Sequence, residues 1–167
     1  QMLENLLNKV NDLNISKQEV KYLEEELKDA KTLLYITDNC GEIVLDKIFI
    51  EELKKRYKNL EIIVMVRGGL AINDATIEDA EEVGLTKIVS VISNGAAITG
   101  TVKEQLSKEA RKYLDSADVI IAKGMGNFES MFEEGINPYY LFLCKCELFT
   151  TRFGVQLFDP IFCKEER

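Results

Sequence analysis

The chain has 167 residues, of which 46% are hydrophobic and 30% charged, which fits one folded domain with a substantial core. Its formal net charge of −8 argues against nucleic-acid binding through bulk electrostatics. The sequence contains no histidine, which excludes histidine triads, histidine general bases and histidine metal ligands. Catalysis would have to use carboxylates, lysine, cysteine, hydroxyls, backbone amides or a metal held by oxygen atoms.

The cysteines and the lack of a long apolar run bear on where the protein works. Cys144 and Cys146 form a C-x-C pair without a second pair, so free thiols are expected rather than a zinc site. We find neither a signal peptide nor an apolar run of membrane-spanning length. We therefore expect a cytoplasmic protein with no membrane or nucleic-acid partner, and a homo-oligomer stays an open alternative.

Helices and strands can be predicted in chain order. Leu3, Leu6, Leu7, Val10 and Leu13 fall at helical spacing, and Ser16 with Glu19 forms an S-x-x-E capping box for a second helix. Apolar runs predict buried strands at 32–37, 61–66, 87–92, 118–122 and 139–143, and an edge strand at 154–158 that Pro160 ends. Helices are predicted at 41–57, 75–83 and 127–134, and a capping box at Thr101 and Glu104 introduces another that contains Leu106, Ala110 and Leu114.

Buried strands that alternate with helices are typical of a parallel sheet covered on both faces. We predict an α/β protein with a Rossmann-like, mostly parallel sheet in a three-layer α/β/α arrangement, formed by residues 31–167. Short helices in residues 1–30 precede it. Because the chain begins with Gln1, we expect this segment to be the remnant of a larger helical region.

Polar and glycine-rich segments follow the predicted strands, at the edge where ligands bind in such sheets. They are 38–42 (Asp-Asn-Cys-Gly-Glu), 67–69 (Arg-Gly-Gly) with 73–74 (Asn-Asp), 93–95 (Ser-Asn-Gly) with 99–101 (Thr-Gly-Thr), 123–129 (Lys-Gly-Met-Gly-Asn-Phe-Glu) and Lys145. Asp38, Asn39 and Asp74 carry hard oxygen atoms that suit Mg²⁺ or Mn²⁺. Lysines and glycine-rich backbone beside such a metal would fit phosphate chemistry.

Structural interpretations compete with this functional one. Asn39 and Asn73 are also favoured helix N-caps, and Asn94-Gly95 is typical of a turn. Thr101 is expected to be a cap, and Cys40 to be a small buried thiol. Lys145 lies in an apolar neighbourhood, and a buried lysine would need a partner.

Together these segments resemble the DUF89 family, also called damage-control phosphatases or the ARMT1-like domain family. The resemblance runs over about residues 30–158 and is carried by 38–44 (Asp-Asn-Cys-Gly-Glu-Ile-Val) with Asp46, 73–76 (Asn-Asp-Ala-Thr), 93–95, 100–101, 122–129 and 145–146 (Lys-Cys). It implies a divalent-metal-dependent phosphatase acting on phosphorylated small metabolites, including sugar phosphates. The metal would be Mn²⁺, Mg²⁺, Co²⁺ or Ni²⁺.

The resemblance also implies roles for single residues. Asp38, Asn39 and Asp74 would hold the metal, and Asp38, Asp74 and Lys145 would be catalytic. The substrate would be bound by Glu42, Asn94, Lys123, Gly124, Met125, Gly126, Asn127, Phe128, Glu129 and Lys145. The sequence leaves open whether a water molecule or Asp38 itself attacks phosphorus.

Other functions compete with hydrolysis. The chain could be a phosphometabolite-binding or regulatory module without turnover, or a fragment of a larger enzyme. A nucleotide-dependent transferase is disfavoured because no G-x-G-x-x-G follows the first strand. Carboxyl methyltransfer has been discussed for the family, so binding of S-adenosylmethionine is a further alternative.

Overall fold

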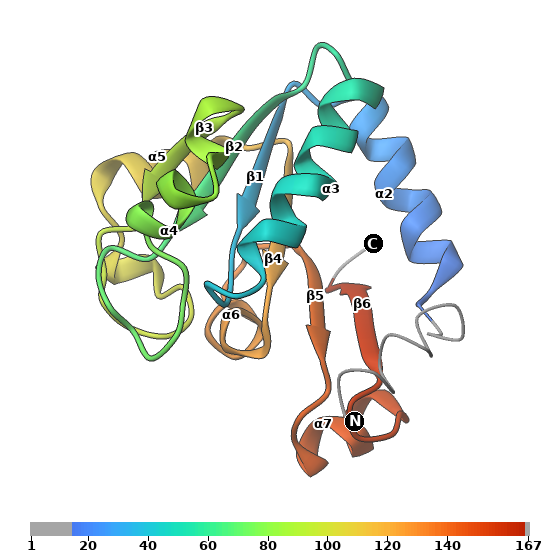
Figure 1. Cartoon of the computed structure of the whole chain (residues 1–167). Helices are drawn as coiled ribbons and strands as arrows, with labels where there is room; N and C mark the ends of the chain where they lie inside the picture. Colours follow the sequence, from blue (N-terminus) through green and yellow to red (C-terminus); the bar gives the residue numbers. More distant parts are fainter. Residues whose placement is uncertain (1–14, 166–167) are drawn as a thin grey trace.

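A mixed six-stranded sheet forms the centre of the computed structural model, which describes residues 15–165 (Figure 1). The strands are β1 (Thr32–Ile36), β2 (Glu61–Val66), β3 (Ser90–Ser93), β4 (Val119–Lys123), β5 (Tyr139–Leu143) and β6 (Pro160–Lys164). Their order is β3-β2-β1-β4-β5-β6, and neighbouring strands are parallel except for β5 and β6. The predicted α/β fold with a mostly parallel sheet is therefore confirmed.

Within residues 15–165, six helices cover the two faces of the sheet. They are α2 (Lys17–Asp29), α3 (Ile43–Arg56), α4 (Ile77–Glu82), α5 (Lys108–Ser116), α6 (Met125–Met131) and α7 (Glu147–Phe153), with 3₁₀ turns η2 (Leu85–Lys87) and η3 (Lys103–Gln105). Residues of α2, α3 and α4 share one core with the sheet, and residues of α5, α6 and α7 share the other. Side chains of a strand alternate between the two cores, so Leu33 and Tyr35 face one and Leu34 and Ile36 the other. These are the three predicted layers.

The strand order reverses between β1 and β4, and this reversal determines where a ligand site is expected. The chain leaves β1 toward one side of the sheet through α3 to β2, and β4 lies on the other side of β1. Such a reversal opens a crevice beyond the carboxyl ends of the two strands. The loops that follow β1 and β4 therefore face one another there.

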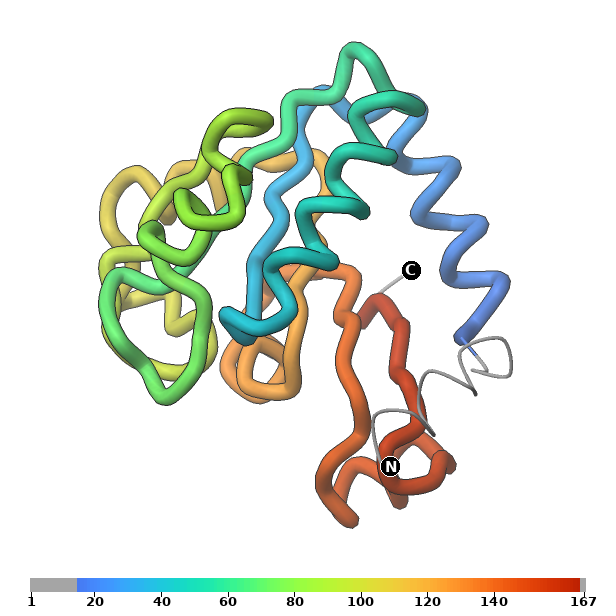
Figure 2. The backbone as a smooth tube through the Cα atoms, viewed as in Figure 1, coloured from blue at the N-terminus to red at the C-terminus, as the bar shows by residue number. Residues whose placement is uncertain are grey.

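The last strand differs from the prediction. Residues 154–158 do not form a strand, since Gly154 ends α7 with a φ of 64° and a turn follows. The edge strand is β6, and Figure 2 shows it returning beside β5 after the α7 excursion. Pro160 begins β6 instead of ending a strand, which an edge position allows because proline lacks only the backbone donor.

Helix starts agree with the sequence in one case and differ in another. Ser16 caps α2, because its Oγ accepts a hydrogen bond from the Glu19 amide at 3.3 Å. The cap of α5 is Ser107 rather than Thr101, since Ser107 Oγ accepts from the Ala110 amide at 3.1 Å. Residues 2–13, predicted as a first helix, lie outside the described residues. No helix in the described part of the chain is long and apolar enough to cross a bilayer.

Candidate active site

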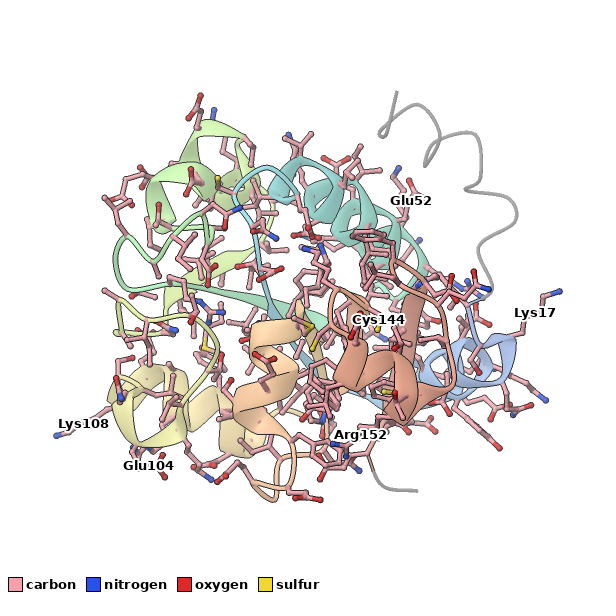
Figure 3. The ribbon with its side chains drawn as sticks, turned by 90° about the horizontal axis from the view of Figure 1, so that it is seen from below. Lys17, Glu52, Glu104, Lys108, Cys144 and Arg152 are labelled. Carbon is pink, nitrogen blue, oxygen red and sulfur yellow. The ribbon has the colours of Figure 1, made fainter. Side chains whose placement is uncertain are left out.

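A cavity of about 380 Å³ lies at the carboxyl ends of β1, β4 and β5. Its wall contains six residues that the sequence assigned to the site: Asp38, Glu42, Lys123, Gly124, Met125 and Lys145. The remaining wall is mostly apolar and consists of Leu45, Leu141, Phe142, Leu143 and Pro160. Figure 3 views the molecule from this edge, and Cys144, which directly follows β5, lies near the centre of the view.

Asp38 and Gly124 meet in this cavity. A Cβ atom at position 124 would lie 2.2 Å from Cγ of Asp38, so only glycine lets the loop after β4 approach the carboxylate. Gly124 has φ 85° and ψ 151°, a conformation that other residues rarely adopt. Burial, together with the negative charges of Glu42 and Asp74, raises the pKa of Asp38 to about 6 against the partial opposition of Lys123 and Lys145. Burial and the two acidic neighbours of Asp38 therefore outweigh the attraction of the two lysines.

Lys123 is held by two carboxylates. Its ammonium donates to Glu42 Oε2 at 2.5 Å and to Asp46 Oδ1 at 2.8 Å, and the hydroxyl of Tyr35 donates to the same Asp46 oxygen at 2.7 Å. Burial opposes ionisation of Glu42, but the hydrogen bond and charge of Lys123 prevail and lower its pKa. Burial prevails at Asp46 and raises the pKa of that carboxyl. Asp46 Oδ2 is buried and has no partner within the described residues.

A second buried network surrounds Asp74. Arg67 Nε donates to Asp74 Oδ2 at 2.6 Å, and its other two nitrogens donate to Thr101 Oγ1 at 3.2 Å and Asn127 Oδ1 at 3.0 Å. Asn127 also accepts from Thr101 Oγ1 and donates to the carbonyls of Thr37 and Lys123. All four side chains of this network are buried. Asn127 thus has its amide fully hydrogen-bonded inside the protein and does not line the cavity.

Backbone hydrogen bonds bring the predicted metal ligands together. The Ala75 amide donates to the Asp38 carbonyl at 2.7 Å, and Asn39 forms an antiparallel bridge with Asp74. The side-chain amide of Asn39 donates to Asp38 Oδ2 at 2.7 Å and to Glu42 Oε1 at 3.2 Å, which leaves its oxygen for a cation. Neither Asn39 nor Asn73 caps a helix, because α3 and α4 begin after Glu42 and Thr76.

This donor set fits a divalent cation with open coordination positions. Within residues 15–165 no three Asp, Glu or Cys side chains gather closely enough to enclose an ion by themselves. Asp38, Asn39 and Asp74 instead offer two carboxylates and one amide, all oxygen ligands, and Asn39 and Asp74 are joined by a backbone bridge. Such a set would leave room for water and substrate on the metal.

Several sequence-assigned residues lie elsewhere. Phe128 belongs to the core, where its ring packs against those of Tyr140 and Phe149 at 4.9 and 5.3 Å. Asn94 is buried and its oxygen accepts from the Gly68 and Ala96 amides, so it joins two loops. Glu129 is exposed and Gly126 packs near Gly100; neither lines the cavity.

Two residues are more exposed than their neighbourhoods suggested. Lys145 was expected to be buried but is exposed at the wall of the cavity, where its charge still acts on Asp38 and Glu42. Cys40 is exposed as well.

The sequence analysis gave no role to Arg67. A charged residue directly after a buried strand is nevertheless a signal that the residue needs a buried partner.

Comparisons with known proteins agree on one family. The model of the damage-control phosphatase ARMT1-like domain matches residues 2–161. A damage-control phosphatase of Pyrococcus horikoshii is 44% identical over 129 residues, which cover 75% of this chain and 44% of that protein. A damage-control phosphatase of Archaeoglobus fulgidus is 38% identical over 139 residues, or 82% of this chain and 47% of that protein. An uncharacterised protein of Methanocaldococcus jannaschii is 42% identical over 141 residues, or 82% and 46%.

A solved structure supports the same assignment. The crystal structure of a DUF89 family protein of Pyrococcus horikoshii superimposes with a TM-score of 0.84 at 36% identity and covers 98% of this chain and 58% of the other. The chain spans less than half the length of the curated relatives it matches. On sequence and fold together, the chain belongs to the damage-control phosphatase ARMT1-like (DUF89) domain family.

Proposed function

We propose that this chain is a divalent-metal-dependent phosphatase domain that hydrolyses phosphomonoesters of small metabolites such as sugar phosphates. The observation that carries the proposal is the convergence of two carboxylates, Asp38 and Glu42, and two lysines, Lys123 and Lys145, on one cavity. A volume of about 380 Å³ suits a small metabolite. The printed names of the Pyrococcus and Archaeoglobus relatives, which are damage-control phosphatases, support the same reaction class.

Asp38, Asn39 and Asp74 would hold the cation. Their oxygen atoms suit Mg²⁺ and Mn²⁺, and Co²⁺ and Ni²⁺ remain candidates because affinity and availability act together. When bound, the metal would neutralise charge on the phosphoryl oxygens.

The two lysines of the cavity wall would bind the phosphate. Lys123 has three N–H donors, and Glu42 and Asp46 accept two hydrogen bonds from it, so one donor remains for a phosphate oxygen. Its two carboxylate partners fix where that donor lies. Lys145 is exposed at the cavity wall, where its ammonium would reach a substrate phosphate. Met125 and Leu45 would contact the carbon skeleton of the metabolite.

Two routes are open for the attack on phosphorus. Asp38 could act as the general base and accept the proton of an attacking water. Alternatively, an Asp38 oxygen attacks phosphorus as the P–O bond to the alcohol breaks, and the leaving oxygen takes a proton from solvent; water then hydrolyses the aspartyl phosphate and releases phosphate. Hydroxylamine trapping during rapid quench separates the routes, because only the second gives a trapped acyl phosphate.

The proposal is tested by phosphate release from sugar phosphates and p-nitrophenyl phosphate. The protein is stripped with a chelator, and each metal is added back in turn. Asp38→Ala is expected to abolish metal-dependent release, whereas Asp115→Asn, an exposed aspartate that pairs with Lys103, should keep it. If folded protein binds the phosphate ester but releases nothing with any metal, the chain is a binding module or an incomplete enzyme. Equal release by both variants would refute the site.

A further inference from the structure

Among the described residues Arg67 is the one buried arginine, and it adjoins a proposed metal ligand; the sequence analysis gave it no role. Its side chain is 2% exposed and that of Asp74 is 7% exposed. Taking a guanidinium out of water is costly unless all its donors are satisfied. We therefore expect Arg67 to be buried because it holds the residues around it in place.

The contacts of Arg67 are arranged in an unusual way for an arginine–carboxylate pair. Arginine commonly grips a carboxylate with two parallel hydrogen bonds. Here only Nε reaches Asp74, and only its Oδ2 atom, because the two terminal nitrogens donate to Thr101 and Asn127. Oδ1 of Asp74 is consequently left for a cation. Because those two partners prevent the guanidinium from turning, they also prevent it from taking both oxygens of Asp74.

The same network fixes Asp74 relative to Asp38. Asn127, which accepts from Arg67, donates to the carbonyl of Thr37, the residue before Asp38, at 3.1 Å. It also donates to the Lys123 carbonyl at 2.6 Å. Through this single amide, Arg67 connects the loops that follow β1, β2, β3 and β4 directly beside the cavity.

We infer that Arg67 is a positioning residue that turns one oxygen of Asp74 toward the metal and fixes its place relative to Asp38. The inference rests on the metal-dependent function proposed above. It predicts that Arg67 matters for metal affinity itself, before any substrate binds. Residues that orient metal ligands typically contribute 10- to 100-fold to affinity.

The test is isothermal titration of the chelator-stripped chain with Mn²⁺ alone. Arg67→Lys keeps the charge but cannot serve Asp74, Thr101 and Asn127 at once, and its Mn²⁺ affinity should fall about 10- to 100-fold. Arg56→Lys is the matched control, because Arg56 forms an exposed pair with Glu24, and it should bind like the wild type. Thr101→Val removes one partner of Arg67 but leaves the bond to Asp74, so its loss should stay below about threefold. Circular dichroism in chelator verifies that each variant is folded.

Each result decides something. An Arg67→Lys affinity within about threefold of wild type would overturn the inference, and so would an equal loss in Thr101→Val, because the network would then only stiffen the loops. If Arg67→Lys does not fold, Arg67→Met replaces it with the same expected loss. If neither folds without metal, Arg67 acts on the fold and the inference is wrong. A wild-type chain that takes up no Mn²⁺ and releases no phosphate would refute the proposed function itself.

Discussion

Replacing Asp38 by asparagine should stabilise the metal-free chain. Asp38 has its pKa raised from 3.8 to about 6, so keeping it ionised in the folded state at neutral pH corresponds to about 3 kcal/mol. Because the carboxyl is only half-buried, water screens part of this, and we expect a gain of about 1–2 kcal/mol for Asp38→Asn. Asparagine also keeps an oxygen that can accept from the Asn39 amide, as Asp38 does at 2.7 Å.

The sign of the pH dependence follows from the direction of the shift. A raised carboxyl pKa means that the folded state binds the proton more tightly, so the contribution of Asp38 to stability becomes more favourable as pH falls through about 6. The advantage of Asp38→Asn should therefore be complete above pH 7 and shrink toward pH 5. Urea unfolding in chelator, followed by circular dichroism because the chain has no tryptophan, measures both.

Metal should reverse the order of stability. On the proposed metal site, a Mn²⁺ concentration 100 times the dissociation constant should stabilise the wild type by about 2.7 kcal/mol, a gain that Asp38→Asn should largely lack. Asp115→Asn, the exposed control, should stay within about 0.5 kcal/mol of wild type in all conditions. An Asp38→Asn variant less stable than wild type in chelator at pH 7.5, or a gain that does not change with pH, would refute the electrostatic reasoning.

Three further predictions concern neighbouring residues. Gly124→Ala should cost at least about 1–3 kcal/mol in backbone strain and abolish the proposed metal binding by pushing the Asp38 carboxyl aside. The control is Gly135→Ala, which is also at positive φ but has open space around it. It should lower the free energy of unfolding by only about 1 kcal/mol and leave metal binding unchanged. Lys123→Met should cost about 3 kcal/mol at pH 7, mainly because it leaves the buried carboxylate of Asp46 without its cation. The loss should shrink at lower pH, where Asp46, whose pKa is already raised, takes a proton; a loss independent of pH would contradict this. Phe128→Leu should lower the free energy of unfolding by about 1–2 kcal/mol without changing KM for a phosphate ester. A raised KM would contradict this and indicate that Phe128 contacts the substrate.

The sequence predicts most of the fold because its signals are local. Apolar runs give β1, β2, β4 and β5, and Ser16 gives the start of α2. It misplaces the last strand, since the turn that follows Gly154 and the antiparallel pairing of β6 depend on contacts with β5. Thr101 has the local spacing of a cap, but its hydroxyl instead donates to Asn127, which is buried and lies 26 positions away in the sequence.

The site is predictable to the level of the loops but not of the side chains. Ligands bind beyond the carboxyl ends of parallel strands, and this rule correctly predicts that Asp38, Glu42, Lys123 and Lys145 line one cavity. It cannot tell which side of the short helix α6 faces the core, so Phe128 and Asn127 were both assigned to substrate. Arg67 was missed for the same reason, because its role is defined by three partners from distant loops.

The pairing of β1 with β4 has a consequence for how the protein acquires its site. Lys123 and Glu42, which meet at 2.5 Å, are 81 positions apart in the sequence, and they meet only once the central strands have found each other. Closing so long a loop is among the slow events in folding, because chain entropy is lost before the contact contributes any stabilising free energy. The outer pairs can form earlier from nearby segments. Metal-binding capacity should thus return with the slowest refolding phase, after most of the helix signal has recovered.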